Sequence, residues 1–234
     1  MKPNLASAKP HFSPEALRLS VPDFFYYVSD LDGLWASTPQ ELLKSANHQL
    51  GLRLNMRHYQ ENLPEMLGLP FDEALRFLRS FYSERMPNLG LMYGAQRTKR
   101  VIASHAIVMD IWTTRRAETI EMTRTWIQDK MALPTGRSAV RDVLHVPVPW
   151  GSEGAHLRTK GEYLLQLPHR PHLFADDELK HVLSVAAHGI QSVLYGNRPG
   201  NREAIVPDNV VKLPNQALLR EYLEEQAAAY EQAA

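Results

Sequence analysis

The sequence predicts an α/β fold, a Rossmann-like doubly wound parallel sheet with a small helical cap domain. Apolar runs of strand length alternate with segments whose apolar residues recur at helical spacing, an order typical of parallel sheets built from strand–helix units. The first run, residues 24–28, is continuously apolar, as expected for a strand that is buried on both faces. A helix-rich stretch separates the first two strands, and this stretch predicts the cap.

Composition and charge place the chain among ordinary globular proteins. Its 234 residues suffice for one large domain, or for a core domain with an insert. The 26 basic residues balance the 26 acidic ones, so the net charge requires neither nucleic acid nor an anionic membrane as a partner. The absence of cysteine excludes disulfides and thiolate metal sites. Without a signal peptide or an apolar run of membrane-spanning length, the chain is expected to be soluble and cytoplasmic, with its oligomeric state left open.

The predicted domain organisation follows from proline content and helical periodicity. Residues 1–22 contain four prolines and no sustained period, and they are expected to form an N-terminal arm. Residues 23–35 and 96–234 are expected to form the Rossmann-like core. Residues 36–95 are expected to form the helical cap, inserted after the first strand.

Three helices are expected in the cap. Thr38 and Glu41 have the spacing of a capping box at the start of the first helix. The second is expected at 56–63, ending before Pro64 because proline disfavours a helical residue ahead of it. The third begins near Pro70 and carries a wide apolar stripe, which indicates packing against the core rather than cofactor binding.

The remaining elements alternate between strand and helix. The strands are expected at 106–112, 143–148, 172–175, 190–195 and 210–213. The helices are expected at 97–105, 117–130, 161–167 and 178–188, with a last helix capped by Asn215. Asp110 lies inside the second strand, where a buried carboxylate needs a partner that the sequence does not identify.

Two carboxylates, Asp30 and Asp32, follow the first strand directly and precede Gly33. Their spacing turns both side chains to the same side of an extended chain. Open α/β sheets place their chemistry beyond the carboxyl ends of such strands. The alternative interpretation is a hairpin turn, because Asp-Gly between apolar runs is a strong hairpin signal.

Polar groups also follow the next three strands. They are Thr113, Thr114 and Arg115 after the second strand, Lys160 on the helix after the third, and Asp176 and Asp177 after the fourth. Each group has an ordinary alternative role, either as a helix cap or as a solvated surface side chain. Their recurrence at matching places favours one shared site, and hydroxyls beside a helix N-terminus suit a phosphate group.

This order of motifs resembles the haloacid dehalogenase superfamily of Rossmann-like phosphotransferases. The similarity rests on Asp30-Leu31-Asp32-Gly33, Thr113-Thr114-Arg115, Lys160, and Leu173-Phe174-Ala175-Asp176-Asp177. It covers residues 23 to about 195, and the insert stands where that family has a cap. Leu34 departs from the family pattern, in which threonine or valine is usual, and Arg158 is a possible substitute for the lysine.

The resemblance implies a magnesium-dependent phosphatase with an aspartyl-phosphate intermediate. Asp30 would be the nucleophile and Asp32 the general acid and base, an assignment that argues against dehalogenation. The implied phosphoryl ligands are Thr113 and Lys160, with Thr114 and Arg115 as further substrate-binding residues. The implied Mg²⁺ ligands are Asp30, the backbone carbonyl of Asp32, Asp176 and waters. Asp177 belongs to the same metal group and would orient water or Lys160.

The cap is expected to select the substrate, for which a small phosphorylated metabolite such as a nucleoside monophosphate is favoured. The candidate cap contacts are Trp35, Arg53, Arg57, His58 and Tyr59. One alternative is the phosphorylated end of a nucleic acid, suggested by Arg115, Arg116, Arg124 and Arg137.

Three readings from other classes are also considered. The first is a binding module of the same fold without turnover, against which the intact pair of aspartates argues. The second is a histidine metal site formed by His156, His169 and His172, whose spacing is not helical. The third is a nicotinamide-binding domain, which is disfavoured because no Gly-x-Gly-x-x-Gly follows the first strand.

Overall fold

The computed structural model describes residues 24–60, 62–105, 107–147, 158–167 and 169–233, so the predicted arm lies outside the described residues. Six parallel strands form one sheet in the order β3-β2-β1-β4-β5-β6. They are β1 (Tyr26–Ser29), β2 (Val108–Thr113), β3 (Asp142–His145), β4 (Leu173–Asp176), β5 (Gln191–Tyr195) and β6 (Val210–Leu213). The predicted doubly wound parallel sheet is confirmed, and each strand lies within a few residues of its predicted place.

The strand order reverses direction at β1, which has β2 on one side and β4 on the other. Ser29 is in register with Ile111 of β2 and with Ala175 of β4, so the three strands end at the same edge. The Asp30 N–H then donates to the Ala175 carbonyl at 2.8 Å. In open α/β sheets such a reversal leaves a crevice beyond the carboxyl ends of the strands, where ligands bind.

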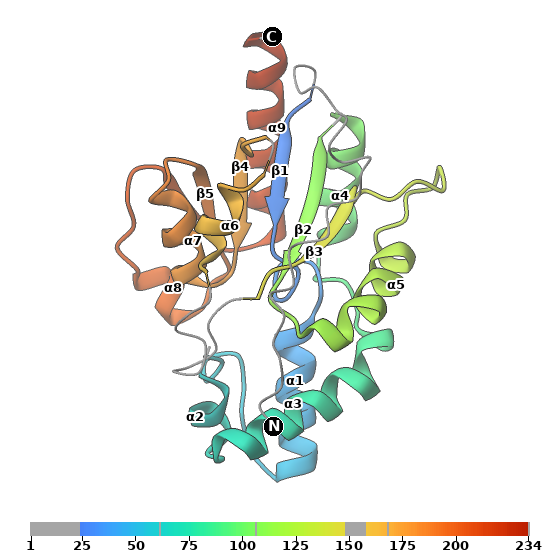
Figure 1. The fold of residues 1–234 in the computed structure, drawn as a ribbon, viewed down its shortest axis with the longest axis vertical. Coiled ribbons are helices and arrows are strands. Elements are labelled where there is room, and N and C mark those ends of the chain that lie inside the picture. The colour runs from blue at the N-terminus through green and yellow to red at the C-terminus, as the bar shows by residue number, and fades with distance from the viewer. Residues whose placement is uncertain (1–23, 61, 106, 148–157, 168, 234) are drawn as a thin grey trace, which may run out of the picture.

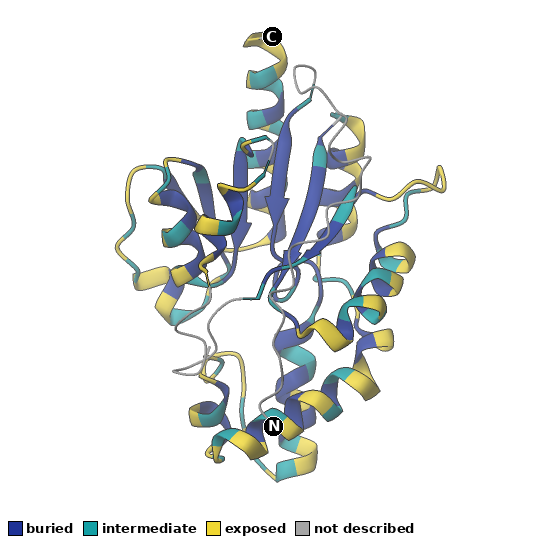
Figure 2. Ribbon diagram, in the orientation of Figure 1, coloured by how far each residue is buried: buried dark blue, intermediate teal, exposed yellow. Residues whose placement is uncertain are grey.

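Helices cover both faces of the sheet. Helices α4 (Ala95–Ser104), α5 (Ile120–Lys130) and α9 (Gln216–Ala233) pack with Tyr27 and Ile111 on one face. Helices α6 (Lys160–Leu164) and α7 (Leu179–Ala186) pack with Val28 and Phe174 on the other. Figure 2 shows the strands buried along nearly their whole length, because helices exclude water from both sides.

The predicted cap segment contains α1 (Thr38–Leu50), α2 (Leu63–Leu67), α3 (Phe71–Arg85) and the short 3₁₀ helix η2 (Met86–Asn88). Figure 1 shows α1, α2 and α3 together beyond the carboxyl end of β1. The other short elements are η3 (Ala117–Thr119) and α8 (Pro199–Glu203). None of the helices among the described residues has the length and apolar character needed to cross a membrane.

The two ends of the cap segment are tied to each other by backbone hydrogen bonds. The Ser37 N–H donates to the Gly90 carbonyl at 2.9 Å, and the Met92 N–H donates to the Trp35 carbonyl at 2.7 Å. Between these two hydrogen bonds, Ala36 pairs with Leu91 in an isolated antiparallel bridge. The chain therefore leaves the core and returns to it at one point.

Two predicted details of the cap are wrong. Residues 56–58 form a turn, and the second helix starts at Leu63 with Pro64 in its first turn. Proline suits that position because the first helical N–H groups have no intrahelical acceptor, so Pro64 begins a helix rather than ending one. At α1 the N-cap residue is Ser37, and the Thr38 hydroxyl donates to Asp32 instead of capping the helix.

Asp110, the buried carboxylate of the second strand, is paired within the core. The Tyr26 hydroxyl donates to its Oδ2 at 2.7 Å, and Arg141 donates to both of its oxygens. The Arg141 guanidinium also stacks over the Tyr26 ring, with Cζ 4.8 Å from the ring centre. This network satisfies the carboxylate that the sequence left without a partner.

Helix α6 lies close to α7 because Gly161 has no side chain. A Cβ at this position would overlap the Ser184 backbone carbonyl, which cannot move without displacing α7. Lys160 is the neighbouring residue on α6, so this close approach also fixes where the lysine enters the core.

Gly161→Ala is expected to lower the free energy of unfolding by about 1–3 kcal/mol, the usual cost of overpacking a core contact. Gly200→Ala is the matched control, since no atom lies within 4 Å of the position a Cβ would take there. In α8 the control should be neutral, or stabilising by up to about 1 kcal/mol. Urea denaturation measures both variants, and equal transition midpoints would contradict the close approach.

Candidate active site

Asp30 lies at the carboxyl end of β1, where it is buried and bound to Lys160. The Lys160 ammonium donates to Asp30 Oδ1 and to Asp176 Oδ2, each at 2.6 Å, and to the Trp112 carbonyl at 3.3 Å. The lysine is fully buried, and Asp30 is 6% exposed. The structure thus brings the carboxyl ends of β1 and β4 together around one cation from α6.

The charges of this cluster are compensated only in part. Burial raises the pKa of Asp30 and of Asp177, while Lys160 opposes the first shift and Arg198 the second. Burial alone would lower the pKa of Lys160, but Asp176 and Asp30 raise it, so the side chain stays an ammonium. When all three carboxylates are ionised, the two cations leave one negative charge unbalanced.

Asp30, Asp176 and Asp177 together fit a small divalent cation. Each offers a carboxylate oxygen, and these oxygens lie within 4.8 Å of one another. Hard oxygen donors of this kind are the ligands that Mg²⁺ prefers. The unbalanced negative charge of the cluster favours the same ion. Within the part of the chain that the structure describes, no other group of acidic or histidine side chains has this geometry.

The Asp32 carboxylate is bound by Arg115 and lies outside that group. Arg115 Nε donates to Asp32 Oδ2 at 2.8 Å, and a terminal nitrogen donates to Oδ1 at 2.6 Å. The Thr38 hydroxyl at the start of α1 also donates to Oδ1. Asp32 therefore accepts a bidentate, charge-assisted pair, although its side chain remains 23% exposed.

Arg115 is almost completely enclosed by protein. Its side chain is 1% exposed, and its second terminal nitrogen lies 3.3 Å from Thr123 Oγ1 and 3.4 Å from Met86 Sδ. The contacts found here orient Asp32, and the predicted contact of Arg115 with a substrate stays a prediction.

The predicted phosphoryl ligands after β2 lie at the same edge of the sheet. Thr113 is buried, and its hydroxyl accepts the Arg115 N–H at 3.2 Å, which shapes the turn after β2. Thr114 is half-buried beside it. Arg158, the possible substitute for Lys160, is exposed. Their roles toward a substrate stay predictions.

Sequence reasoning missed the residues that hold Asp177. The Arg198 guanidinium pairs with Asp177 Oδ2 at 3.3 Å and donates to its backbone carbonyl, and Asn201 Nδ2 donates to the same carbonyl at 2.9 Å. Arg198 follows β5 at its carboxyl end. The rule that found the other groups, a polar residue just after a strand, applies to this position as well.

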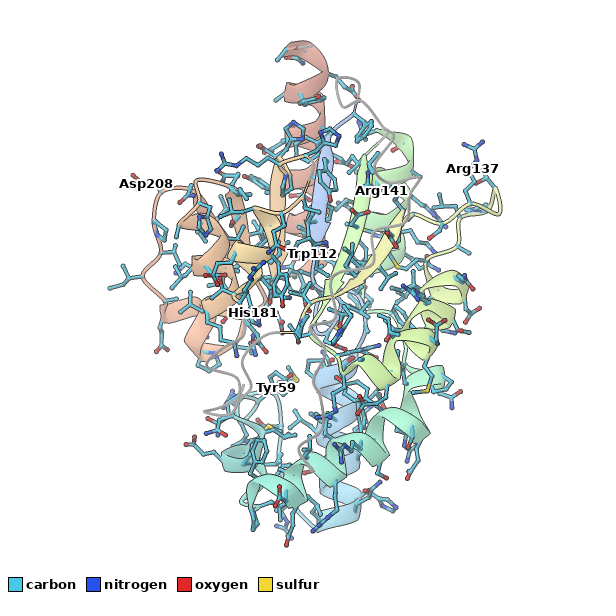
Figure 3. All side chains as sticks on the ribbon, viewed as in Figure 1. Tyr59, Trp112, Arg137, Arg141, His181 and Asp208 are labelled. Carbon is cyan, nitrogen blue, oxygen red and sulfur yellow. The ribbon has the colours of Figure 1, made fainter. Side chains whose placement is uncertain are left out.

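The candidate cap contacts occupy different environments. Trp35 is fully buried and its Nε1 donates to Ser29 Oγ at 2.8 Å, and its contact with a substrate stays a prediction. Arg53, Arg57 and His58 are exposed. Tyr59 is half-buried and lies between the sheet and α2, as Figure 3 shows.

The histidine metal site receives little support. His172 Nδ1 accepts the Tyr26 N–H at 3.0 Å, and its ring stacks on Phe25. His169 is half-buried, and His156 lies outside the described residues.

Gly33 permits the turn that brings the loop after β1 against Asp177. Its φ of +75° lies in the left-handed region, and a Cβ there would overlap Asp177 Oδ2. Both the conformation and the contact therefore require glycine.

No protein-family model and no curated protein matches the sequence. Solved structures do match. Protein Tyrosine Kinase A from Mycobacterium tuberculosis aligns with a TM-score of 0.59 at 18% identity, over 85% of this chain and 97% of that one. A haloacid dehalogenase-like hydrolase from Streptococcus pneumoniae aligns with a TM-score of 0.55 at 14% identity, over 85% and 98%. A putative beta-phosphoglucomutase from Thermotoga maritima aligns with a TM-score of 0.55 at 14% identity, over 86% and 99%.

These likenesses extend over nearly the whole of each matched protein. The chain has the haloacid dehalogenase-like fold, which confirms the fold that the sequence motifs implied. At this level of identity the similarity establishes the fold alone, and function is argued from the side chains.

Gly33→Ala is expected to displace Asp177 and to weaken Mg²⁺ binding roughly 10-fold, since it disturbs one carboxylate of the candidate metal group. Gly51→Ala is the matched control: Gly51 has a φ of +66°, but no atom lies within 4 Å of its Cβ position. Both variants should lose about 1–2 kcal/mol of stability from the left-handed conformation. Calorimetric titration with Mg²⁺ compares them, and equal affinities would contradict the assigned contact.

Proposed function

We propose that the chain is a magnesium-dependent phosphomonoester hydrolase that acts through an aspartyl-phosphate intermediate. The observation that carries the proposal is the cluster in which Lys160 joins Asp30 to Asp176 at the reversal point of the sheet. Structural neighbours, among them a haloacid dehalogenase-like hydrolase and a predicted phosphoglycolate phosphatase from Haemophilus somnus, support the same class.

In the first step a carboxylate oxygen of Asp30 attacks phosphorus, and the bond between phosphorus and the ester oxygen breaks. Lys160 holds Asp30 in place and offsets negative charge on the transferring phosphoryl group. Asp32 supplies the proton that the leaving oxygen takes up, a contribution typically worth ~10²–10⁴-fold in rate. The result is an aspartyl phosphate and a free alcohol.

In the second step water attacks the phosphorus of the aspartyl phosphate. Asp32 takes the proton of that water, the acyl phosphate bond breaks, and Asp30 is regenerated with release of inorganic phosphate. The two aspartates suit these different parts because Asp30 is buried against an ammonium, whereas Asp32 is partly exposed and held by Arg115.

Asp30, Asp176 and the Asp32 backbone carbonyl would hold the Mg²⁺, and Asp177 would orient a water on the ion or the Lys160 ammonium. When bound, the ion would neutralise charge on the phosphoryl oxygens.

The proposed substrate is a small phosphorylated metabolite, with a nucleoside monophosphate favoured. Tyr59 of the cap lies between the sheet and α2, where an aromatic side chain can contact the group that carries the phosphate. The arginines that suggest a nucleic-acid end are engaged elsewhere or dispersed. Arg115 is enclosed with Asp32, and Arg116 and Arg124 pair with Glu118 and Glu121. Arg137 lies on the loop beyond α5, far from the site (Figure 3).

Wild-type protein is expected to release phosphate from at least one member of a panel of phosphomonoesters, only when Mg²⁺ is present. Asp30→Asn should lower kcat by roughly 10³-fold or more, because the amide cannot form the covalent intermediate. The control is Asp208→Asn, the same chemical change at an exposed aspartate. Turnover that survives Asp30→Asn would exclude this mechanism, and turnover independent of Mg²⁺ would exclude the metal.

A further inference from the structure

Two tyrosine rings of the cap lie against the two arginines that hold site carboxylates. The Arg115 guanidinium carbon lies 5.2 Å from the centre of the Tyr82 ring, and that of Arg198 lies 5.3 Å from the centre of the Tyr59 ring. Both distances are within the roughly 6 Å range of a cation–π interaction. The rings come from separate parts of the cap, since Tyr82 is on α3 and Tyr59 precedes α2.

The two contacts lie on opposite sides of the reaction centre. Arg115 follows β2 and Arg198 follows β5, and in the sheet these strands flank the central pair β1 and β4. On each side the order is the same: a cap tyrosine, a core arginine and a site aspartate, namely Asp32 or Asp177. This repeated arrangement connects the cap with the site both on the β2 side and on the β5 side of the reaction centre.

The physical consequence follows from the planar guanidinium. Each guanidinium is held on two sides, because its N–H groups face a carboxylate while its central carbon lies over a tyrosine ring. Arg115 has a 1% exposed side chain and Arg198 an 11% exposed one, and exclusion of water strengthens both interactions. Partial burial among charged groups also raises the pKa of both tyrosines, so the rings are neutral.

We propose that Tyr82 and Tyr59 are positioning residues, which align Asp32 and Asp177 through Arg115 and Arg198 when the cap is seated on the core. This inference rests on the proposed phosphatase function. It assigns the two sides different effects, because Asp32 serves proton transfer to the leaving oxygen and Asp177 belongs to the metal group.

The test on the Asp32 side compares Tyr82→Leu with Tyr82→Phe, which keeps the ring. For an alkyl phosphate, Tyr82→Leu should lower kcat about 10-fold with KM nearly unchanged, a part of what general acid catalysis contributes. For 4-nitrophenyl phosphate the loss should be less than about 3-fold, because that leaving group departs without a proton. Tyr82→Phe should restore wild-type behaviour on both substrates.

Phe77→Leu controls for loosened cap packing, since Phe77 is a buried residue of the same helix, whereas the cation–π contact of Arg115 is with Tyr82. It should lower stability and leave the ratio of the two kcat values unchanged. Equal losses on both substrates in Tyr82→Leu, or failure of Tyr82→Phe to restore the ratio, would overturn the proposal for Tyr82.

The test on the Asp177 side needs no turnover. Calorimetric titration of Tyr59→Leu should show Mg²⁺ binding weakened about 3- to 10-fold, as when a residue that orients a metal ligand is changed. Tyr59→Phe should bind Mg²⁺ as wild type does. Equal affinities in all three proteins would overturn the proposal for Tyr59.

A spectroscopic measurement separates this inference from the proposed function. The NMR signal of the Arg115 Nε–H group, identified by its absence in Arg115→Lys, should change its chemical shift in Tyr82→Leu and keep it in Phe77→Leu. If wild-type protein hydrolyses no phosphomonoester, the proposed function fails. The Arg115 signal and the Mg²⁺ affinities then still test whether the two tyrosines align Asp32 and Asp177. An unmoved signal would exclude the contact itself.

Discussion

The structure depends on one buried ammonium group. Lys160 has no exposed surface and lies between two buried carboxylates, Asp30 and Asp176. An unpaired lysine at this depth would be strongly destabilising, and so would either carboxylate alone. The arrangement requires β1 and β4 to be neighbours, and it requires α6 to approach α7 closely enough that Gly161 cannot carry a side chain. Strand order, helix packing and the candidate chemistry therefore meet at a single side chain.

Two aspartates separated by one residue acquire different properties from what surrounds them. Asp30 faces the ammonium and the acidic residues after β4, whereas Asp32 faces a guanidinium and the first turn of α1. Their backbones are almost adjacent, so the difference comes from the elements packed on either side. Carboxyl groups in such unlike environments are suited to different steps of one reaction.

The sheet and the residues after its strands could be predicted because their signals are local. An apolar run followed by Asp30 or Asp176 indicates, within a few consecutive residues, both a buried strand and a polar group at its carboxyl end. Arg198 stands shortly after a strand, but its pairing with Asp177 could not be predicted, and neither could that of Arg141 with Asp110, since tertiary packing chooses which of many arginines meets a given carboxylate. The local pattern predicts a helix start at Thr38 correctly, but tertiary structure makes Ser37 the N-cap residue and directs the Thr38 hydroxyl to Asp32.

The paired backbone at 35–37 and 90–92 has a consequence for how such a protein can change. Where the two ends of an insert are already held together, its length adds only a slowly growing, logarithmic term to the entropy of closing the loop. The segment between them can then lengthen, shorten or be exchanged with little effect on the sheet. A new insert would keep the buried lysine and its carboxylates and would alter what reaches them, so selectivity could diverge while the reaction stays the same.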